Sequence, residues 1–269
     1  MKVTVHPLFW VVIGFALLFG RFLEIISLFT IVVIHELGHV YTAKAFGWRV
    51  TEISLLPFGG VAKVDELGNT LIREECMVAL AGPFINGLMM ALSVLMYRLG
   101  WWNREWADFF FIGNAYIALF NLLPIWPLDG SKVLKALISY ACPYRKVIRL
   151  IIWVSSFGIL FLLWTSVSQP DKHLNVLFIN FFLAYSTFIF YRHREYHFFR
   201  FLIAKYDAIQ LAKESWPVKF IYIKGNEPVK DLLKRLFREK YHLFSQMDEK
   251  KKNKEFIGEE VLLNAYFNR

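Results

Sequence analysis

Long apolar runs alternate with short polar segments along the first 191 residues of the chain. Each run is about 20 residues long, the length that a helix needs to cross the ~30 Å hydrocarbon core of a bilayer. Arg21 and Glu24 interrupt an apolar stretch near the N-terminus, so we divide that stretch into two runs. The pattern predicts six transmembrane helices, at residues 6–23, 26–46, 76–97, 107–127, 147–167 and 174–191.

The composition favours an integral membrane protein over a soluble domain. The 269 residues are 57% hydrophobic and 18% aromatic, and the mean hydropathy is +0.41. With both termini inside, 10 basic residues outside the tail face the cytoplasm and 4 face the other side, as membrane proteins prefer. No small-residue cleavage site follows the first run, so we expect a retained helix. Cys76 and Cys142 fall at predicted cytoplasmic helix ends, where a disulfide is not expected.

A more polar pattern begins after residue 191. Residues 192–215 form an amphipathic linker, and residues 216–269 form a small α+β cytoplasmic domain. In that domain the pattern predicts strands at 218–225 and 242–248 and helices at 231–240 and 258–267. The run EKKKNKE is expected to be a solvated loop, and contact with anionic lipid is the alternative. The predicted fold class is an all-α polytopic membrane protein with a small α+β C-terminal domain.

The second apolar run carries HELGH at residues 35–39, and such ionisable groups are costly inside a membrane. His35 and His39 are four residues apart, so a helix presents both imidazoles on one face, where they can bind one metal ion. Glu36 lies beside them and can accept a proton from a water molecule at that metal. A purely structural role would not offset the free-energy cost of an unpaired His–Glu–His cluster in lipid. The motif therefore predicts a zinc site.

A zinc hydrolase needs a third protein ligand and an open position for water. Asp129 is the only acidic residue between positions 109 and 170, and it follows Pro124 and Pro127, which should end the fourth helix. In the predicted topology the second and fourth helices run in the same direction, so their polar ends can lie at similar depth. A helix-capping role for Asp129 is the alternative. The expected metal ligands are His35, His39 and Asp129.

Three motifs occur in an order that resembles the site-2 family of intramembrane metalloproteases. They are HELGH at 35–39, AGPFIN at 81–86 and NLLPIWPLDG at 121–130. The resemblance implies a site-2 protease core with zinc bound by the three expected ligands and Glu36 as the general base. It also implies that Asn121 stabilises the oxyanion, and capping of an unwound helix is the alternative for Asn121. Gly82 and Pro83 are expected to pack tightly against the catalytic helices.

The same resemblance suggests where a substrate binds. The segment LLPFGGVAKVDE at 55–66 would dip into the membrane and line a substrate groove, although a simple hairpin turn is the alternative. A substrate helix must unwind to expose a peptide bond, and β-type pairing along residues 59–64 would satisfy its freed backbone groups. The expected substrate-binding residues are Pro57, Phe58, Gly59, Gly60, Pro124 and Pro127.

The resemblance implies regulated intramembrane proteolysis. The tail resembles the single CBS domain of a bacterial branch of the family that matures a membrane-tethered sigma factor precursor, of the pro-sigma-K type, during sporulation. That branch implies ATP at the tail domain, membrane proteins as inhibitors, and termini on the mother-cell side of the forespore membrane. The sequence does not decide whether the chain forms a homo-oligomer. No nucleic-acid partner is expected.

Three other functions stay open on the residues alone. A site-2 protease can act instead on anti-sigma factors or on remnant signal peptides. An inactive membrane scaffold would retain the fold without the chemistry. A zinc transporter would also place ligands in the membrane, but it usually needs more histidines or carboxylates in its other helices.

Overall fold

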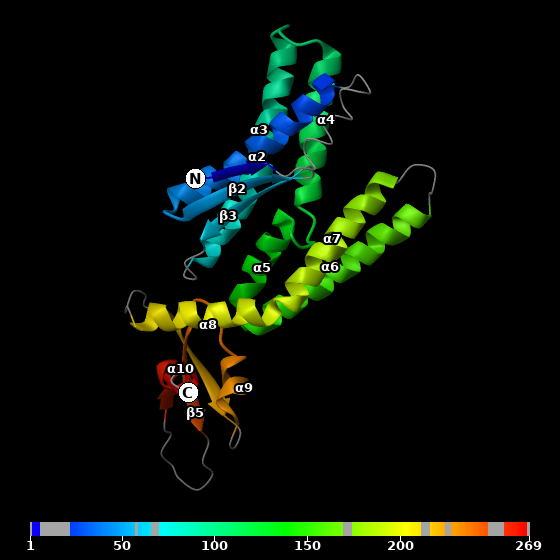
Figure 1. Cartoon of the computed structure of the whole chain (residues 1–269). Coiled ribbons are helices and arrows are strands. Elements are labelled where there is room, and N and C mark those ends of the chain that lie inside the picture. Colours follow the sequence, from blue (N-terminus) through cyan, green and yellow to red (C-terminus); the bar gives the residue numbers. More distant parts are fainter. Residues whose placement is uncertain are drawn as a thin grey trace. The chain divides into compact units, whose positions relative to one another are not determined.

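The structure is a computed structural model that describes residues 2–5, 22–56, 59–65, 70–168, 174–210, 216–223, 227–246 and 256–267. The chain divides into two compact units. The first contains residues 1–66, 73–124 and 128–133, and the second contains residues 67–72, 125–127 and 134–269. Figure 1 labels their elements. Nearly all of the predicted first transmembrane helix, at 6–23, lies outside the described residues.

The first unit combines a small sheet with long helices. Strand β2 lies in the middle of the sheet, parallel to β1 and antiparallel to β3, so β3 is an edge strand. Helix α2 packs against α4 and against both β2 and β3. The elements are β1 (Lys2–Val5), α2 (Phe22–Ala45), β2 (Arg49–Leu56), β3 (Gly59–Asp65), α3 (Ile72–Arg98) and α4 (Arg104–Asn121).

Local sequence signals set the ends of these helices. Gly47 has φ of +76°, and hydrogen bonds from the N–H groups of Gly47 and Trp48 to the carbonyls of Lys44 and Ala43 close α2. Asn103 caps the start of α4, because its side-chain oxygen accepts a hydrogen bond from the Trp106 N–H. Helix α4 ends at Asn121, earlier than the predicted boundary at 127, since the following segment contains two prolines.

Helix α5 (Asp129–Ala141) begins directly after that proline-containing segment. Its first five residues belong to the first unit and the rest belong to the second. The start of α5 is important for function because Asp129 is its first residue.

In the second unit, the helices α6 and α7 lie side by side, and α8 continues from the end of α7 (Figure 1). Strand β5 lies in the middle of a second sheet, parallel to β4 and antiparallel to β6. The elements are α6 (Tyr144–Val167), α7 (Leu174–Arg192), α8 (Arg194–Gln210), β4 (Val218–Ile223), α9 (Val229–Leu233), β5 (Tyr241–Gln246), β6 (Phe256–Gly258) and α10 (Glu259–Phe267).

The small sheet and the helices of the second unit share one hydrophobic core. Val147 and Ile151 of α6 and Leu202 of α8 are buried in the same cluster as residues from the tail. The tail contributes Leu233, Leu236, Phe244 and Leu263, each of which is at most 1% exposed. Removing the tail would therefore expose apolar side chains of α6 and α8 to water.

The prediction of a helix at residues 231–240 is wrong beyond its first turn. Helix α9 ends at Leu233, and the following residues form turns. Tertiary hydrogen bonds explain the early end: the Phe237 N–H donates to His242 Nε2, and the Lys205 ammonium donates to the carbonyls of Phe237 and Lys240. These partners replace the bonds that a longer helix would have made.

Three of the described helices are long and apolar enough to cross a membrane, at Leu23–Ala45, Ile72–Arg98 and Tyr144–Ser166. A shorter apolar helix spans Val176–Arg192. These helices indicate a membrane environment, and the described part of the chain is mostly helical. The count of six spans stays a prediction.

Candidate metal centre

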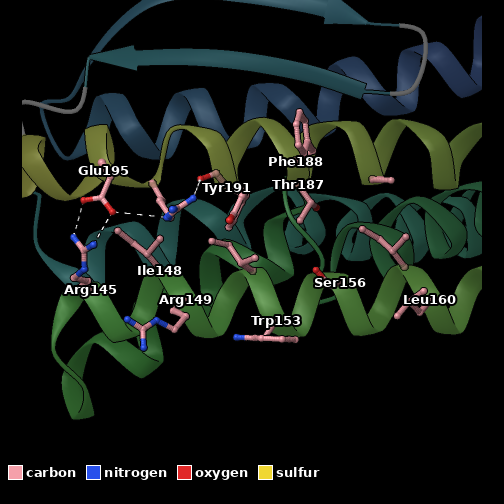
Figure 2. A pocket seen from close by; sticks show the side chains of 14 residues that line it. Arg145, Ile148, Arg149, Trp153, Ser156, Leu160, Thr187, Phe188, Tyr191 and Glu195 are labelled. Atoms are coloured by element: carbon pink, nitrogen blue, oxygen red, sulfur yellow. Dashed lines mark hydrogen bonds and ion pairs between the residues drawn. The ribbon is translucent and has the colours of Figure 1, made fainter.

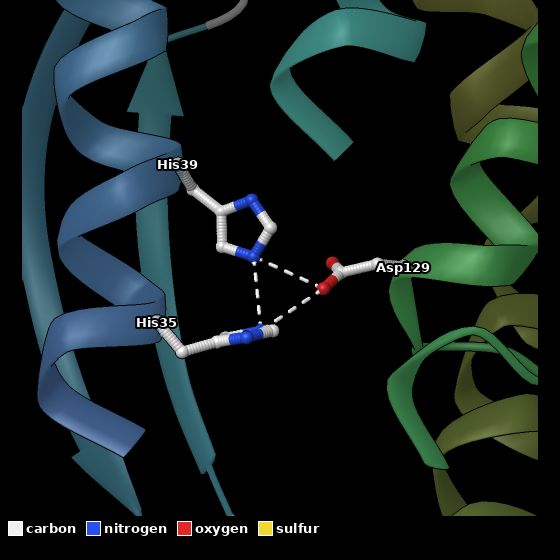
Figure 3. Close-up of side chains that lie close together, drawn as sticks. All are labelled: His35, His39 and Asp129. Atoms are coloured by element: carbon white, nitrogen blue, oxygen red, sulfur yellow. Dashed lines mark hydrogen bonds and ion pairs between the residues drawn. The ribbon is translucent and has the colours of Figure 1, made fainter. Parts of the chain in front are cut away.

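Helix α2 presents His35 and His39 on one face, as the four-residue spacing predicts. Both imidazoles are buried, with 1% of His35 and 8% of His39 exposed. Asp129, at the start of α5, is 4% exposed and points its carboxylate at the two rings (Figure 3). Three polar side chains from two helices therefore meet at one buried point.

The three facing atoms are nearly equidistant. His35 Nε2 and His39 Nε2 are 3.2 Å apart, and Asp129 Oδ2 is 3.2 Å from the first and 3.0 Å from the second. Two ligand atoms of a tetrahedral zinc ion, each about 2.1 Å from the metal, lie about 3.4 Å apart. The spacing of the three atoms therefore fits one zinc ion with a fourth position left for water.

The other ring nitrogen of His39 is fixed by the backbone of α3. His39 Nδ1 lies 2.7 Å from the carbonyl oxygen of Val78, which can only accept a hydrogen bond. Nδ1 must therefore carry the proton, and Nε2 of the neutral ring presents its lone pair toward His35 and Asp129. This is the tautomer that a metal-binding histidine needs.

His35 reaches the same tautomer through a chain of two asparagines. Its Nδ1 donates to Asn86 Oδ1 at 2.5 Å, Asn86 Nδ2 donates to Asn114 Oδ1 at 2.9 Å, and Asn114 Nδ2 donates to the Phe110 carbonyl at 2.8 Å. The Phe110 carbonyl accepts only, so it sets the orientation of both amides. Asn86 and Asn114 are both fully buried, and together they keep the lone pair of His35 on Nε2.

When both rings are neutral, three acceptor atoms thus converge. Two lone pairs and a carboxylate oxygen at 3.0–3.2 Å repel one another, and either a cation or a proton among them relieves this repulsion. The donor set of two imidazoles and one carboxylate is typical of zinc in hydrolases. Lys132 donates to the other carboxylate oxygen, Asp129 Oδ1, at 2.8 Å, which leaves Oδ2 to face the histidines.

Gly82 of α3 leaves room for the two rings. A Cβ at this position would lie 2.6 Å from His35 Cε1 and would also overlap the ring of His39. Any larger residue would displace both imidazoles. The expected tight packing of the AGPFIN segment against the catalytic helix is therefore present at Gly82.

Glu36 borders a cavity beside the metal centre. The cavity has a volume of about 310 Å³ and lies between α2 and α4, where His35, Tyr116 and Asn121 also line it. Glu36 is 9% exposed, so its carboxylate is largely shielded from water. A water molecule or a peptide carbonyl in this cavity would lie beside the carboxylate and the histidine.

Asn121 lines this cavity, but its amide also makes a bond within its own helix. Asn121 Nδ2 donates to the Ile117 carbonyl at 3.0 Å. This bond agrees with the structural alternative for Asn121. The amide group has a second hydrogen, so a donor role toward an oxyanion also stays a prediction.

The expected substrate-binding residues fall into two groups. Gly59 and Gly60 begin β3 and pair with Leu56 and Leu55 of β2, whereas Pro57 and Phe58 lie outside the described residues. Pro124 and Pro127 lie in the non-helical segment between α4 and α5. Whether any of these six residues contacts a substrate stays a prediction.

Sequence reasoning missed the residues that orient the histidines. Asn86 ends the AGPFIN motif and Asn114 lies in the fourth apolar run, and a buried amide in a membrane helix is a recognisable signal because it must find a partner. Lys132, which hydrogen-bonds to Asp129, is one of the basic residues that the pattern places on the cytoplasmic side. The sequence could have marked these residues as polar exceptions, but it could not show that they contact the histidines or Asp129.

Comparison with known proteins supplies independent evidence. The pattern that defines peptidase family M50 matches residues 23–101 and 99–163 of this chain. Stage IV sporulation protein FB of Bacillus subtilis is 38% identical over 208 residues, which cover 77% of this chain and 72% of that protein. A zinc metalloprotease of Methanocaldococcus jannaschii is 35% identical over 124 residues, which cover 45% of this chain and 36% of that protein.

A solved structure has a similar fold. The site-2 protease from Methanocaldococcus jannaschii superimposes with a TM-score of 0.56 and 26% sequence identity. The match covers 69% of this chain and 88% of that one. The residues that the family pattern matches include HELGH at 35–39.

Proposed function

The chain belongs to peptidase family M50 and is a zinc metalloprotease, and from that premise we propose that it cleaves membrane-tethered protein substrates within the membrane. We assign His35, His39 and Asp129 as the zinc ligands and Glu36 as the general base. The observation that carries this assignment is the convergence of three acceptor atoms at 3.0–3.2 Å. Such a set can hold a cation, and the donor types fit zinc.

A bound zinc ion would lower the pKa of a water molecule and polarise a substrate carbonyl. Glu36 accepts the proton of the attacking water and passes it to the leaving amine. The largely buried position of Glu36 beside His35 supports this role, because both groups border the same cavity. Asn121 borders it as well and supplies an amide hydrogen to the developing oxyanion.

The edge strand β3 supports a route for substrate binding. Within the described residues, β3 pairs with β2 on one side only, and it packs against α2, which carries the histidines. An extended substrate segment can add to such an edge through main-chain hydrogen bonds. We propose that the substrate unwinds and pairs along β3, with Pro57, Phe58, Pro124 and Pro127 contacting its side chains.

The substrate that we propose is the membrane-associated pro-sequence of a sporulation sigma factor precursor. The similarity to a stage IV sporulation protein supports this substrate over anti-sigma factors and remnant signal peptides. The proposal includes six membrane spans with both termini in the cytoplasm and a CBS-like tail at 216–269. Regulation by ATP at the tail and by inhibitory membrane proteins is a further expectation from the family resemblance.

Glu36→Gln tests the assignment of the base. The substitution removes the basic oxygen but retains the size of the side chain, so cleavage should fall by about 10²–10⁴-fold while zinc content stays unchanged. The assay co-expresses the enzyme with a membrane-tethered sigma factor precursor and, separately, with a membrane-tethered anti-sigma factor. Product size reports cleavage, and elemental analysis of the purified chain reports zinc.

Glu24→Gln is the matched control, because it removes the same charge from the same helix far from the histidines. Near-normal cleavage by Glu36→Gln would remove Glu36 from the mechanism. Loss of zinc in Glu36→Gln would instead identify Glu36 as a ligand. Cleavage of the anti-sigma factor alone would overturn the proposed substrate and leave the proposed chemistry intact.

A further inference from the structure

The second unit contains a large cavity that the proteolytic chemistry does not use. It has a volume of about 770 Å³ and lies between α6 and α7, with the start of α8 at one end. Helix α6 is one of the three helices apolar enough to cross a membrane, and α7 is the shorter apolar helix. The cavity is therefore a groove between two apolar helices.

The polarity of the lining changes along the groove. Arg145, Arg149 and Glu195 gather at one end, and Leu160 lies at the other (Figure 2). The walls between them are mainly apolar and include Ile152, Ile159 and Phe188. A ligand that fits this gradient has a charged head and a long apolar chain.

The charged end has a surplus of positive charge. Arg145 makes two hydrogen bonds to Glu195, at 2.8 and 2.6 Å, and these bonds lower the pKa of the Glu195 carboxyl, so it is ionised at neutral pH. Arg194 approaches the same carboxylate at 3.7 Å. Arg149 is paired with no acidic side chain in the described part of the chain. Two guanidinium groups thus share one carboxylate, and Arg149 adds a third positive charge beside them.

The start of α6 adds to this positive potential. The helix begins at Tyr144 after Pro143, which makes no side-chain cap, and its first turn contains no acidic residue. The first turns instead hold Arg145, Lys146 and Arg149, although the positive end of the helix dipole disfavours cations there. A bound anion would offset both the dipole and the uncompensated guanidinium groups.

Two aromatic residues indicate how deep in the membrane the charged end of the groove lies. Trp153 and Tyr191 line the groove near the arginines, and both are more than a third exposed. Exposed Trp and Tyr side chains of membrane proteins concentrate at the level of the lipid head groups. The charged end of the groove therefore lies where phosphate groups are found, and the apolar end extends into the hydrocarbon.

We propose that this groove binds an anionic phospholipid. The phosphate contacts Arg149 and the side of Arg145 and Arg194 that Glu195 leaves available, and one acyl chain lies along Ile152, Ile159 and Phe188. Guanidinium groups bind phosphate through paired, charge-assisted hydrogen bonds, which gives preference for an anionic head group over a zwitterionic one. The lipid would stabilise the junction of α6, α7 and α8 on which the tail packs.

The test uses the purified full-length chain in detergent and counts retained lipids by native mass spectrometry. Phosphatidylglycerol and phosphatidylcholine with identical acyl chains are compared. We expect phosphatidylglycerol to be retained at least about 10-fold more strongly, and Arg149→Ala to remove most of this preference. Lys146→Ala is the matched control, because it removes a charge from the same helix end without lining the groove.

Two further arms test the head group and the chain separately. Ala184→Phe should fill part of the groove and weaken retention of both lipids without changing any charge. Glycerol 3-phosphate at millimolar concentration should not displace the lipid, because it lacks the chain. Zinc content and elution volume show that each variant has folded, and Arg149→Lys should retain part of the preference.

Equal retention of the two lipids by the unaltered chain would overturn the proposal. The proposal would also fail if Lys146→Ala lost the preference for phosphatidylglycerol as completely as Arg149→Ala. The preference would then arise from the general positive charge of this surface. Displacement by glycerol 3-phosphate would identify a site for small phosphates instead. None of these results depends on proteolytic activity.

Discussion

The chain buries histidine beside carboxylate in two places, and the two clusters differ in where their hydrogens lie. In the first unit, His35, His39 and Asp129 meet at one point. In the second unit, His242 of β5 and Glu259 of α10 are fully buried together with Lys205 of α8, which is 2% exposed. The residue types are similar, but the hydrogen bonds around them are not.

In the tail cluster each ring nitrogen already has a protein partner. His242 Nδ1 donates to Glu259 Oε2 at 2.6 Å, and Nε2 accepts from the Phe237 N–H at 3.2 Å. Lys205 lies 3.2 Å from Glu259 Oε1 and donates to two backbone carbonyls. Both nitrogens of His242 therefore have protein partners, and the cluster links the tail to α8.

In the metal centre, only the Nδ1 atom of each histidine, which faces away from Asp129, is hydrogen-bonded to a group outside the centre. Val78 and Asn86 accept from the Nδ1 atoms, so the Nε2 atoms are the ones that face Asp129. A buried histidine and carboxylate can form a metal site when surrounding acceptors bind the Nδ1 atoms and leave the Nε2 atoms facing the carboxylate. They become a structural cluster when donors and acceptors alternate.

The largest effect is expected when each carboxylate is replaced by an amide, because the two replacements should change different properties. Asp129→Asn removes the anionic oxygen from the centre, so zinc content should fall from one per chain to near zero and proteolysis should stop. Glu259→Gln should leave zinc unchanged and instead destabilise the tail by about 3–5 kcal/mol, because it leaves Lys205 without its ionic partner. Elemental analysis and thermal unfolding measure the two results. Retained zinc in Asp129→Asn would move the third ligand elsewhere.

An intermediate effect is expected from the asparagine chain. Asn86→Ala removes the acceptor of His35, which frees the ring to rotate and change tautomer, so zinc affinity should fall by about 10–100-fold. Asn86→Asp retains an acceptor and should lose less. Competition with a chelator measures affinity, and the absorption spectrum of the cobalt-substituted protein reports ligand geometry.

Asn180→Ala is the matched control for that experiment. Asn180 is also a buried asparagine on an apolar helix, 1% exposed, but it lies in α7 of the second unit. Its replacement should leave both zinc affinity and the cobalt spectrum unchanged. If the two variants behaved alike, the asparagine chain would have only a general packing role.

The smallest effect concerns the pH dependence of the tail. Burial lowers the pKa of His242 below its ordinary value, even though Glu259 opposes this shift, and Lys205 and Lys219 add to it. As pH falls below about 6.5, the unfolded chain takes up a proton that the folded chain excludes. The free energy of unfolding of the tail should therefore be greatest above this pH and should decrease below it.

His242→Asn isolates this contribution, because it retains a donor for Glu259 and cannot titrate. Limited proteolysis of the tail between pH 7.5 and 6 should accelerate in the unaltered chain more than in the variant, and zinc content should be equal in both. The ratio of the two proteolysis rates cancels the pH dependence of the added protease. Parallel behaviour across this range would exclude His242 as the source.

The family was predictable from short motifs, and the comparisons confirm it. HELGH at helical spacing and a single carboxylate in a long apolar region indicate a metal site, because ionisable groups are costly in lipid, and the three motifs together resemble a metalloprotease family. The same reasoning selected Asp129 as a partner for the histidines, and the folded chain brings the three together. That they bind zinc is still a prediction.

The helix expected at 231–240 shows where local patterns are insufficient. Leu232, Leu233, Leu236 and Phe237 have helical spacing, and they are buried as expected. The helix nevertheless ends at Leu233, because His242 of β5 and Lys205 of α8 bind the backbone that follows. These tertiary hydrogen bonds overrode a correct hydrophobic pattern.

The sequence by itself determined the membrane environment, the helical spacing of His35 and His39, and the residue types able to bind zinc, because composition and short-range spacing are local properties. Only the tertiary structure decided which nitrogen of each histidine faces the centre. That choice depends on Val78, Asn86 and Asn114, which lie 39 to 79 positions away in the chain. It also decided that His242 and Glu259 form a closed cluster, because the positions of hydrogens follow from the partners that folding supplies.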